Sequence, residues 1–278
     1  MQGKILSTNG SEEKQITLPE AFSEEVREDL ILRAVLSERS YKLQPQGHSI
    51  LAGMQTTATY YGAMHSYRSG RHMGVAIRPR QKLGGGVQGM VRRIPSSVKG
   101  KRAHPHMIEK KLYEKMNKRE YQKAIASAVA ATASEKHTRH KHTPIIVASG
   151  IDSVKKTKDM VAIFRNVGLG QILDDSKDKK HSKPGIRRGA VQRKYKKSIL
   201  LVVGNDNGAI KAARNIAGSD ACTVEHLTAE SLAPGGIPGR TTVWSEAAIH
   251  KLESAITALN PPGFLNGEKK PATPSKTV

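Results

Sequence analysis

Apolar and polar positions alternate along this chain with two different periods. Near the start, the short runs 3–7 and 15–18 have the composition of strands, and a helical apolar face begins at Val26. Ser23 stands just before that face and is predicted to cap a helix that continues to about Glu38. The beginning of the chain therefore predicts two strands and one amphipathic helix.

The chain from residue 117 onward continues this alternation. Asn117 and Glu120 form the signature of a capped helix start, and Ser245 is predicted to cap the last helix. Further helices are predicted at about 153–167 and 210–217, each ended by a glycine. Compact apolar runs predict strands at 144–148, 198–203, 221–224 and 241–244. Apolar strands separated by helices indicate an α/β fold, in which a mainly parallel sheet is covered by helices on both faces.

The segment 40–108 follows neither period. It contains ten glycines and four prolines, which interrupt any helix or strand pattern. It is also far longer than ordinary loops, so we expect it to be disordered or to be ordered by something outside the fold. The chain is thus predicted to form one globular α/β domain from 1–39 and 109–262, interrupted by a long extended basic loop at 40–108. The polar remainder, 263–278, is predicted to be a flexible tail.

The distribution of charged residues gives the strongest indication of what the segment 40–108 binds. The chain has 46 Lys and Arg against 24 Asp and Glu, a formal net charge of +22. From Arg39 to Ile108 there is no acidic residue at all, but twelve Lys and Arg. Ordinary domain surfaces mix both signs, so this segment is either a solvated basic linker or an arm that lies in nucleic acid. Glycine favours the second interpretation, because it lets a backbone approach phosphates closely.

A second basic cluster spans 177–197, with ten Lys and Arg and Asp178 as its single acid. Pro184, Gly185 and Gly189 predict a loop between strands. Alone, this cluster is compatible with a localisation signal or a solvated turn. Two separate cationic loops on one chain favour contact with a polyanion at several sites.

Composition excludes several other classes of protein. The single cysteine, Cys222, excludes disulfide frameworks and Cys-based metal centres. Aromatic residues make up only 4%, which argues against a reader of single strands built on stacking rings. No apolar run approaches the roughly 20 residues that cross a bilayer, and the N-terminus has no apolar signal core. We therefore expect a cytoplasmic protein without a membrane partner.

Two motifs could indicate a nucleotide or cofactor site, but the residues around them do not match such a site. Gly84-x-Gly86-x-x-Gly89 fits the dinucleotide fingerprint, but no predicted strand precedes it and the first acid downstream is Glu109. The turn 204–208 follows a strand yet lacks the Lys-Ser/Thr pair of a phosphate loop.

Two further groups of residues are poor candidates for a metal site or a catalytic nucleophile. The histidines of 137–142 are interleaved with three cations, which disfavours a metal, and Cys222 and His226 have no orienting acid beside them. The sequence predicts binding rather than catalysis, with no catalytic residue, no cofactor, no metal and no small-molecule substrate.

Several stretches resemble the fourth protein of the large ribosomal subunit, the L-four family, in its archaeal and eukaryotic branch. In and just after the basic segment, these are Gln55–Ala58, Ser69–Arg71, Leu83–Gly86 and Val98–Pro105. In the rest of the chain they are Asn117–Glu120, Ala128–Ala133, Arg193–Tyr195, Ala212–Gly218 and Leu232–Arg240. The resemblance covers nearly the whole chain in order, and the stop near residue 278 favours the archaeal type.

This resemblance implies a structural constituent of the large ribosomal subunit that binds ribosomal RNA and supports subunit assembly. It implies a long loop that extends into the RNA and reaches the wall of the nascent-peptide exit tunnel. The implied partners are large-subunit RNA, neighbouring ribosomal proteins and, near the loop tip, the nascent peptide. The residue pattern that follows the Gly70-Arg71 turn departs from the family, which leaves the geometry of the tip open.

The basic residues, glycines and one tyrosine of these stretches are the predicted RNA contacts. They are Arg68, Arg71, Arg78, Arg80, Lys82, Gly84, Gly85, Gly86, Arg92, Arg93, Lys99, Lys101, Arg102, His104, Arg187, Arg188, Arg193, Lys194, Tyr195, Lys196 and Lys197. The predicted exit-tunnel tip is Arg71, His72, Met73, Gly74, Val75, Ala76, Ile77 and Arg78. Arginine offers a planar fork for phosphates and a face for unpaired bases.

Two alternatives remain open at the level of sequence. One is a nucleotide-binding α/β enzyme that carries a basic disordered insert. The other is a free RNA chaperone or regulator that uses the same arm on RNA outside the ribosome.

Overall fold

The computed structural model describes residues 1–56, 58–60, 62–63, 65, 74–84, 87–92, 94–103, 106–138, 143–181 and 193–262. The chain divides into two compact units. The first, called here the globular unit, is Met1–Lys42 together with the chain from Tyr113 onward. The second, the loop unit, is Leu43–Leu112.

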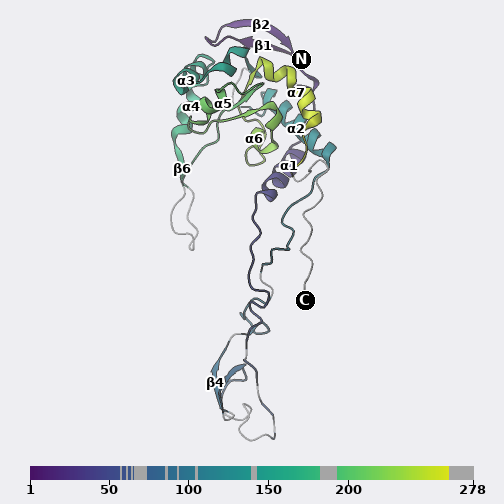
Figure 1. Cartoon of the computed structure of the whole chain (residues 1–278), viewed down its shortest axis with the longest axis vertical. Coiled ribbons are helices and arrows are strands. Elements are labelled where there is room, and N and C mark those ends of the chain that lie inside the picture. Colours follow the sequence, from purple (N-terminus) through teal and green to yellow (C-terminus); the bar gives the residue numbers. More distant parts are fainter. Residues whose placement is uncertain are drawn as a thin grey trace. The chain divides into compact units, whose positions relative to one another are not determined.

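A six-stranded sheet forms the centre of the globular unit (Figure 1). Its strands are β1 (Gln2–Leu6), β2 (Glu12–Thr17), β5 (Ile145–Val147), β8 (Leu200–Val203), β9 (Asp220–Thr223) and β10 (Thr242–Ser245). Their order is β2-β1-β5-β10-β8-β9, and every neighbouring pair is parallel except β1 and β2. This confirms the predicted α/β class and adds one antiparallel edge strand.

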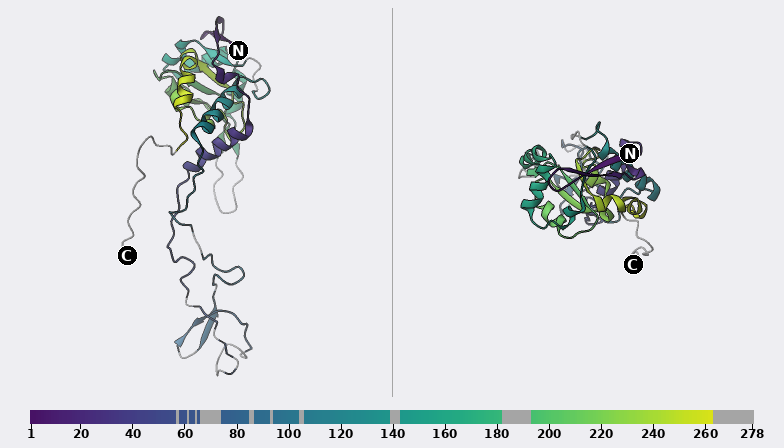
Figure 2. Two further views of the ribbon diagram at one scale, coloured as in Figure 1. Left: turned by 90° about the vertical axis from the view of Figure 1, so that its right-hand side faces the viewer. Right: turned by 90° about the horizontal axis from the view of Figure 1, so that it is seen from above.

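Helices cover both faces of this sheet, as Figure 2 shows from above. One face carries α1 (Glu28–Tyr41), α2 (Lys118–Ala133), α6 (Ala229–Leu232), α7 (Glu246–Ala258) and the 3-10 turns η1 (Glu20–Phe22) and η4 (Val224–His226). The other carries η3 (Ser149–Ser153), α3 (Thr157–Asn166), α4 (Gly170–Lys177) and α5 (Ala209–Arg214). Each face has its own apolar core.

The central strands supply both cores because successive side chains of a strand point to opposite faces. Leu200 and Val202 pack into the core beneath α1 and α2, whereas Leu201 and Val203 pack into the opposite core. All four side chains are fully buried. This two-sided burial explains why these strands appear in the sequence as continuous apolar runs.

The first long helix begins later than predicted. Its N-cap residue is Arg27, while Ser23 ends the 3-10 turn η1. The prediction that Ser23 caps this helix is wrong, because Phe22 is buried in the core and fixes a separate turn before the helix. The Phe22 ring meets Trp244 of β10 edge to face, with ring centroids 5.5 Å apart.

Other helix boundaries agree better with the sequence. Ser245 caps α7 as predicted, since its hydroxyl accepts a 3.2 Å hydrogen bond from the Ala248 amide. Asn117 stands at the N-cap of α2 but makes no side-chain cap, and Glu120 pairs instead with Arg33. The predicted helix at 153–167 is divided into η3 and α3, and α4 is an additional helix that the apolar pattern did not predict.

Two antiparallel strand pairs form where the sequence predicts only loops. β3 (Arg80–Lys82) pairs with β4 (Gln88–Val91) in the loop unit, and β6 (Lys179–His181) pairs with β7 (Arg193–Tyr195) in the globular unit. The expectation of no regular structure is wrong for these short segments. Backbone hydrogen bonds hold both pairs. Because these strands lack alternating apolar residues, the apolar pattern of the sequence does not predict them.

Candidate RNA-binding surface

Residues 49–54 form a tight turn in the loop unit that depends on one glycine. Gly53 has φ +83°, a region that other residues rarely adopt, and a Cβ there would lie 1.9 Å from the Arg102 carbonyl oxygen. The Met54 amide closes the turn by donating to the Leu51 carbonyl at 2.9 Å. Gly53 therefore lets two segments of the loop unit, distant in sequence, pack backbone to backbone.

A hairpin forms the second structured part of the loop unit. The Thr59 and Arg80 backbones bridge each other, and the Arg92 amide donates to the Pro79 carbonyl at 3.0 Å. The hairpin thus joins β3 and β4 to residues on both sides of them. Gly84 lies in the connection between the two strands.

Three arginines of the loop unit are oriented by neutral oxygens. Arg78 donates to its neighbouring Ile77 carbonyl at 3.2 Å, and Arg80 donates to the Ala76 carbonyl at 3.1 Å. Arg92 donates to the Gln81 side-chain oxygen from Nε at 3.3 Å and from Nη2 at 2.8 Å. These bonds hold the guanidinium groups in place without neutralising their charge.

The electrostatics of the loop unit are one-sided. Glu109 is the only acidic residue between Leu43 and Leu112, so the cations of this unit have almost no internal counter-charge. Arg78, Lys82 and Lys101 are exposed. A surface of this kind attracts polyanions and gains free energy by releasing their counterions.

The structure describes most but not all of the predicted RNA contacts. Those in the described part of the loop unit are Arg78, Arg80, Lys82, Gly84, Arg92, Lys99, Lys101 and Arg102. Outside the described residues lie Arg68, Arg71, Gly85, Gly86, Arg93, His104, Arg187 and Arg188. Of the predicted tunnel tip, Gly74, Val75, Ala76, Ile77 and Arg78 are described, and Arg71, His72 and Met73 are not.

The second predicted cluster begins on the β6–β7 pair. Arg193, Lys194 and Tyr195 form β7, and the Tyr195 side chain is exposed. Lys196 is exposed as well, but Lys197 binds both carboxylate oxygens of Asp220, at 2.7 and 2.8 Å. Lys197 thus has an acidic partner within the protein, and its charge is less available to RNA than that of Lys196.

Asp220 also anchors a buried arginine that sequence reasoning noted only as part of the family-like stretch 232–240. Arg240 is almost completely buried, and its Nη2 donates to Asp220 at 2.6 Å. Nη2 also donates to the Ile199 carbonyl, while Nε donates to the Ser198 carbonyl and Nη1 to the Ser231 carbonyl. Arg240 therefore fixes the start of β8, the end of α6 and the edge strand β9 to one another, next to the cationic β7.

Burial and charge act in opposite directions on the groups of this network. Burial alone would raise the pKa of Asp220, but the hydrogen bonds and charges of Lys197 and Arg240 outweigh it and lower that pKa. Burial lowers the pKa of Arg240, and the Asp220 carboxylate opposes that shift. The carboxylate is thereby held ionised and the pair is structural.

The other residues considered for catalysis or metal binding are Cys222 and the histidines of 137–142. Burial raises the pKa of the Cys222 thiol to about 12, which makes it a poor nucleophile. The His137 ring lies 3.8 Å from a Glu28 carboxylate oxygen, and His140 and His142 lie outside the described residues. In the part of the chain that the structure describes, no cluster of His, Cys, Asp or Glu could hold a metal ion. Those same residues include no helix long and apolar enough to cross a membrane.

Comparison with known proteins decides what this arrangement belongs to. The model of the ribosomal protein L4/L1 family matches residues 16–255, most of the chain. The chain is 41% identical over 261 residues to the large ribosomal subunit protein uL4 of Archaeoglobus fulgidus, covering 91% of this chain and 98% of that protein. It is 40% identical over 264 residues to the protein of the same name from Methanocaldococcus jannaschii, with the same coverage of both chains. The chain belongs to the ribosomal protein L4/L1 family.

Membership of this family confirms the resemblance predicted from the sequence and the prediction that the chain is not an enzyme, since the family consists of ribosomal proteins. A third archaeal relative, from Methanococcoides burtonii, is 42% identical over 259 residues, which are 90% of this chain and 96% of the relative. The alternative of a nucleotide-binding enzyme with a basic insert is therefore wrong.

Sequence reasoning missed the neutral residues of the loop unit that hold its cations in place. Gln81 stands between Arg80 and Lys82, which are predicted RNA contacts, but among the described residues it is the uncharged Gln81 whose side chain orients Arg92. Charge density was the signal used, and an uncharged side chain contributes nothing to it. Alternation of side chains along β3 and β4 could have revealed the hairpin, but strands of three and four residues are too short to show a period.

Proposed function

We propose that this protein is a structural constituent of the large ribosomal subunit that binds ribosomal RNA and supports subunit assembly. The observation that carries the proposal is the loop unit, a cationic insertion with a single acidic residue in a protein of the L4/L1 family. The relatives it resembles are named as large-subunit proteins. Its partners are then large-subunit RNA and neighbouring ribosomal proteins, in the cytoplasm.

Binding follows from the physical chemistry of the two cationic regions. Each Lys or Arg that neutralises a phosphate releases condensed counterions and adds about −0.7 to −0.9 to the slope of log affinity against log salt. The exposed cations of the loop unit and those near β7 act as separate attachment points on the RNA. The α/β unit serves as the folded base that carries them.

We further propose that the segment 71–78 lies at the wall of the nascent-peptide exit tunnel. Val75 and Ile77 support this proposal, because their side chains are exposed in the midst of a cationic segment. Apolar groups at such a position gain nothing from phosphates and suit a neighbouring peptide. The nascent chain would then pass next to the loop tip.

Co-sedimentation tests the main proposal. Tagged full-length protein, expressed in a related archaeal host, should migrate with large subunits on a sucrose gradient at moderate salt. A variant with Arg78, Arg80, Lys99 and Lys101 changed to glutamine should shift toward the unassembled fraction. Migration of the unaltered protein away from large subunits would sink the proposal and favour a free RNA chaperone.

The tunnel proposal needs a separate test. A photoreactive residue at Ile77 should crosslink to a radiolabelled nascent chain in stalled ribosomes. The matched position is Val98, which is almost fully exposed in the same unit but lies outside the proposed tip. Equal labelling of the nascent chain from both positions, or none from Ile77, would contradict the placement of the tip.

A further inference from the structure

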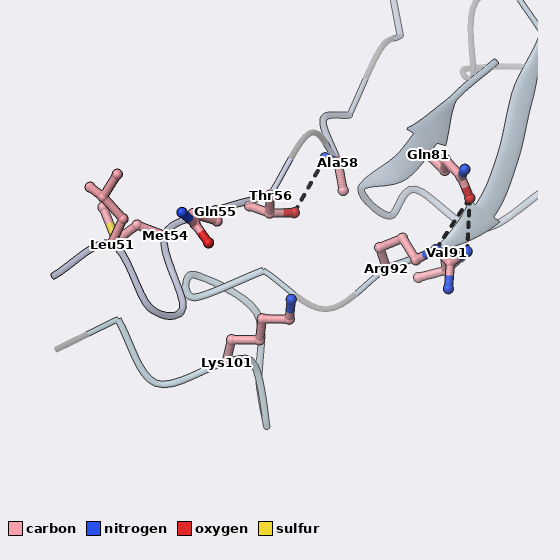
Figure 3. A pocket seen from close by; sticks show the side chains of 9 residues that line it. All are labelled: Leu51, Met54, Gln55, Thr56, Ala58, Gln81, Val91, Arg92 and Lys101. Atoms are coloured by element: carbon pink, nitrogen blue, oxygen red, sulfur yellow. Dashed lines mark hydrogen bonds between the residues drawn. The ribbon is translucent and has the colours of Figure 1, made fainter. Parts of the chain in front are cut away.

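A cavity of about 960 Å³, wide open to solvent, lies on the surface of the loop unit. It is lined by Leu51, Met54, Gln55, Thr56, Ala58, Gln81, Val91, Arg92 and Lys101. Figure 3 shows Leu51 and Met54 on the turn at one end, Gln81 and Arg92 of the hairpin region at the other, and Lys101 on a third segment. A volume near 1,000 Å³ is at the upper end of the range for ligand sites, so the cavity has room for a nucleotide.

The lining of this cavity combines three kinds of chemistry. Leu51 and Met54 provide an apolar wall, and Val91 adds an apolar side chain at the hairpin end; each of the three is about half exposed. Exposed apolar side chains such as Leu51 and Met54 that lie together at a concave surface mark a place where something else is bound. Gln81 and Thr56 add amide and hydroxyl groups that can donate and accept hydrogen bonds.

Charge decides what kind of molecule fits. Arg92 and Lys101 are the two charged residues of the lining, and both are cations. The lining residues include no carboxylate, and the nearest acid in the sequence of the loop unit is Glu109. A ligand for this cavity therefore presents a flat, largely apolar body, a hydrogen-bonding edge and a negative charge.

We propose that this cavity receives one unstacked nucleotide of the RNA to which the loop unit binds. The inference rests on the proposed function, since it names what that RNA contributes at one particular place. The base lies against Leu51 and Met54, whose aliphatic and thioether groups contact a π face well. The phosphate lies at Lys101, a compact charge suited to phosphate oxygens.

Arg92 is already oriented for such a ligand. Its Nε and Nη2 both donate to the Gln81 side-chain oxygen, which fixes the plane of the guanidinium. A fixed planar cation at this end of the cavity adds an oriented positive charge for the same negatively charged nucleotide. Gln81 retains its amide NH₂ group for the edge of the base, because only its oxygen is used by Arg92.

A peptide segment fits the same lining less well. A bound peptide would gain from a carboxylate that receives basic side chains, and the lining has none. Two cations beside an apolar wall satisfy a nucleotide completely, because phosphate and base occupy the two kinds of surface. We therefore assign the cavity to RNA and leave a peptide as an outcome of the test.

A pair of matched variants tests the assignment in the full-length protein. Replacing Leu51 and Met54 by alanine removes the apolar wall, and Ile50→Ala removes a more exposed neighbour that does not line the cavity. Binding to transcribed large-subunit RNA should weaken about fivefold or more in the double variant, the range for losing one stacked base, and less than about twofold in Ile50→Ala. The salt dependence should stay unchanged in both, because no phosphate contact is lost.

Crosslinking identifies the occupant. Benzoylphenylalanine in place of Met54 should label a single position of the RNA in reconstituted large subunits, whereas the same residue in place of Ile50 should not label that position. A protein product from position 54, or equal affinity of the double variant and Ile50→Ala, would overturn the assignment while leaving RNA binding by the loop unit intact. Failure of the unaltered protein to bind the RNA at all would instead overturn the proposed function.

Discussion

The carboxylate of Glu38 accepts a hydrogen bond of 2.7 Å from the hydroxyl of Tyr121. The same carboxylate accepts bonds from the backbone amides of Ala229, at 2.7 Å, and Glu230, at 2.8 Å. Glu38 is thus a buried acid that joins α1 to α2 and accepts the first two amides of the short helix α6, whose N-cap is Thr228. Burial raises the pKa of Glu38, and the three donors oppose that shift.

Removing this carboxylate should destabilise the globular unit. Glu38→Ala leaves two backbone amides and a tyrosine hydroxyl buried without their acceptor, each costing about 1 kcal/mol or more, so we expect a loss of roughly 3 kcal/mol. Urea unfolding monitored by tryptophan fluorescence would measure it, because Trp244 lies in the same core. Glu13→Ala, an exposed position on β2, should change the free energy of unfolding by less than about 0.5 kcal/mol. Equal effects would show that Glu38 is not the anchor of these helices.

The pH dependence of stability should carry the signature of Asp220. Its pKa is lowered in the folded protein, so its contribution is present above the unfolded pKa, near 4, and is lost as the pH falls through the folded pKa. Asp220→Asn should therefore flatten the acid limb of a plot of unfolding free energy against pH. Asp174→Asn, at an exposed pair with Lys177, is the matched control and should flatten it much less. An unaltered acid limb in Asp220→Asn would contradict the role of this network.

Replacing the whole loop unit should leave the globular unit folded. Both apolar cores are built without any residue of Leu43–Leu112. The rings of Tyr41 and Tyr113 stack with centroids 5.4 Å apart, so a linker of about five Gly and Ser residues closes the gap. We expect the midpoint of thermal unfolding to move by less than about 4 °C, while affinity for large-subunit RNA falls strongly. Loss of cooperative unfolding would show that the globular unit depends on the loop unit.

The sequence predicted the fold class because the strands that decide it are buried on both sides. Runs such as Leu200–Val203 carry no polar residue, and that pattern is distinctive. Boundaries set by tertiary contacts were less predictable. Ser23 has the right chemistry for a helix N-cap. The neighbouring Phe22 is buried in the core, however, and Ser23 ends the separate 3-10 turn η1 instead. Local preference is weaker than the free energy of burying an aromatic ring.

The candidate site was predictable only to the extent that it is charged. An acid-free segment can be counted in a sequence, whereas the cavity beside Arg92 depends on three segments that meet in space. The positive φ of Gly53 lets the turn approach the Arg102 backbone, and the bond between Gln81 and Arg92 joins the two sides of the hairpin. Neither leaves a periodic trace in the sequence, since each depends on one or two residues.

Single cations of the loop unit should each contribute to salt-dependent binding. Arg80→Gln and Lys101→Gln are each expected to reduce the slope of log affinity against log salt by about 0.7 to 0.9, through the loss of one phosphate contact. Filter binding to large-subunit RNA over a series of KCl concentrations measures this slope. Lys4→Gln serves as the control, because its ammonium pairs with Glu12 on the edge of the sheet. A slope that changes as much in the control as in the loop variants would mean that binding depends on overall charge and not on these positions.

Among the described glycines of the loop unit outside its hairpin, Gly53 should be the one least tolerant of replacement by alanine. Alanine there meets the Arg102 carbonyl and must adopt a strained backbone, so the turn 49–54 has to open. Gly150→Ala is the matched change, because a Cβ at Gly150 would make only an ordinary contact with Thr8, at 3.9 Å, and Gly150 is not a predicted RNA contact. We expect Gly53→Ala to weaken RNA binding severalfold without altering the unfolding of the globular unit, and Gly150→Ala to have little effect on either. Hydrogen exchange should show faster exchange at the Met54 amide only in Gly53→Ala, since that amide closes the turn, and unchanged protection there would show that the turn tolerates the extra methyl group.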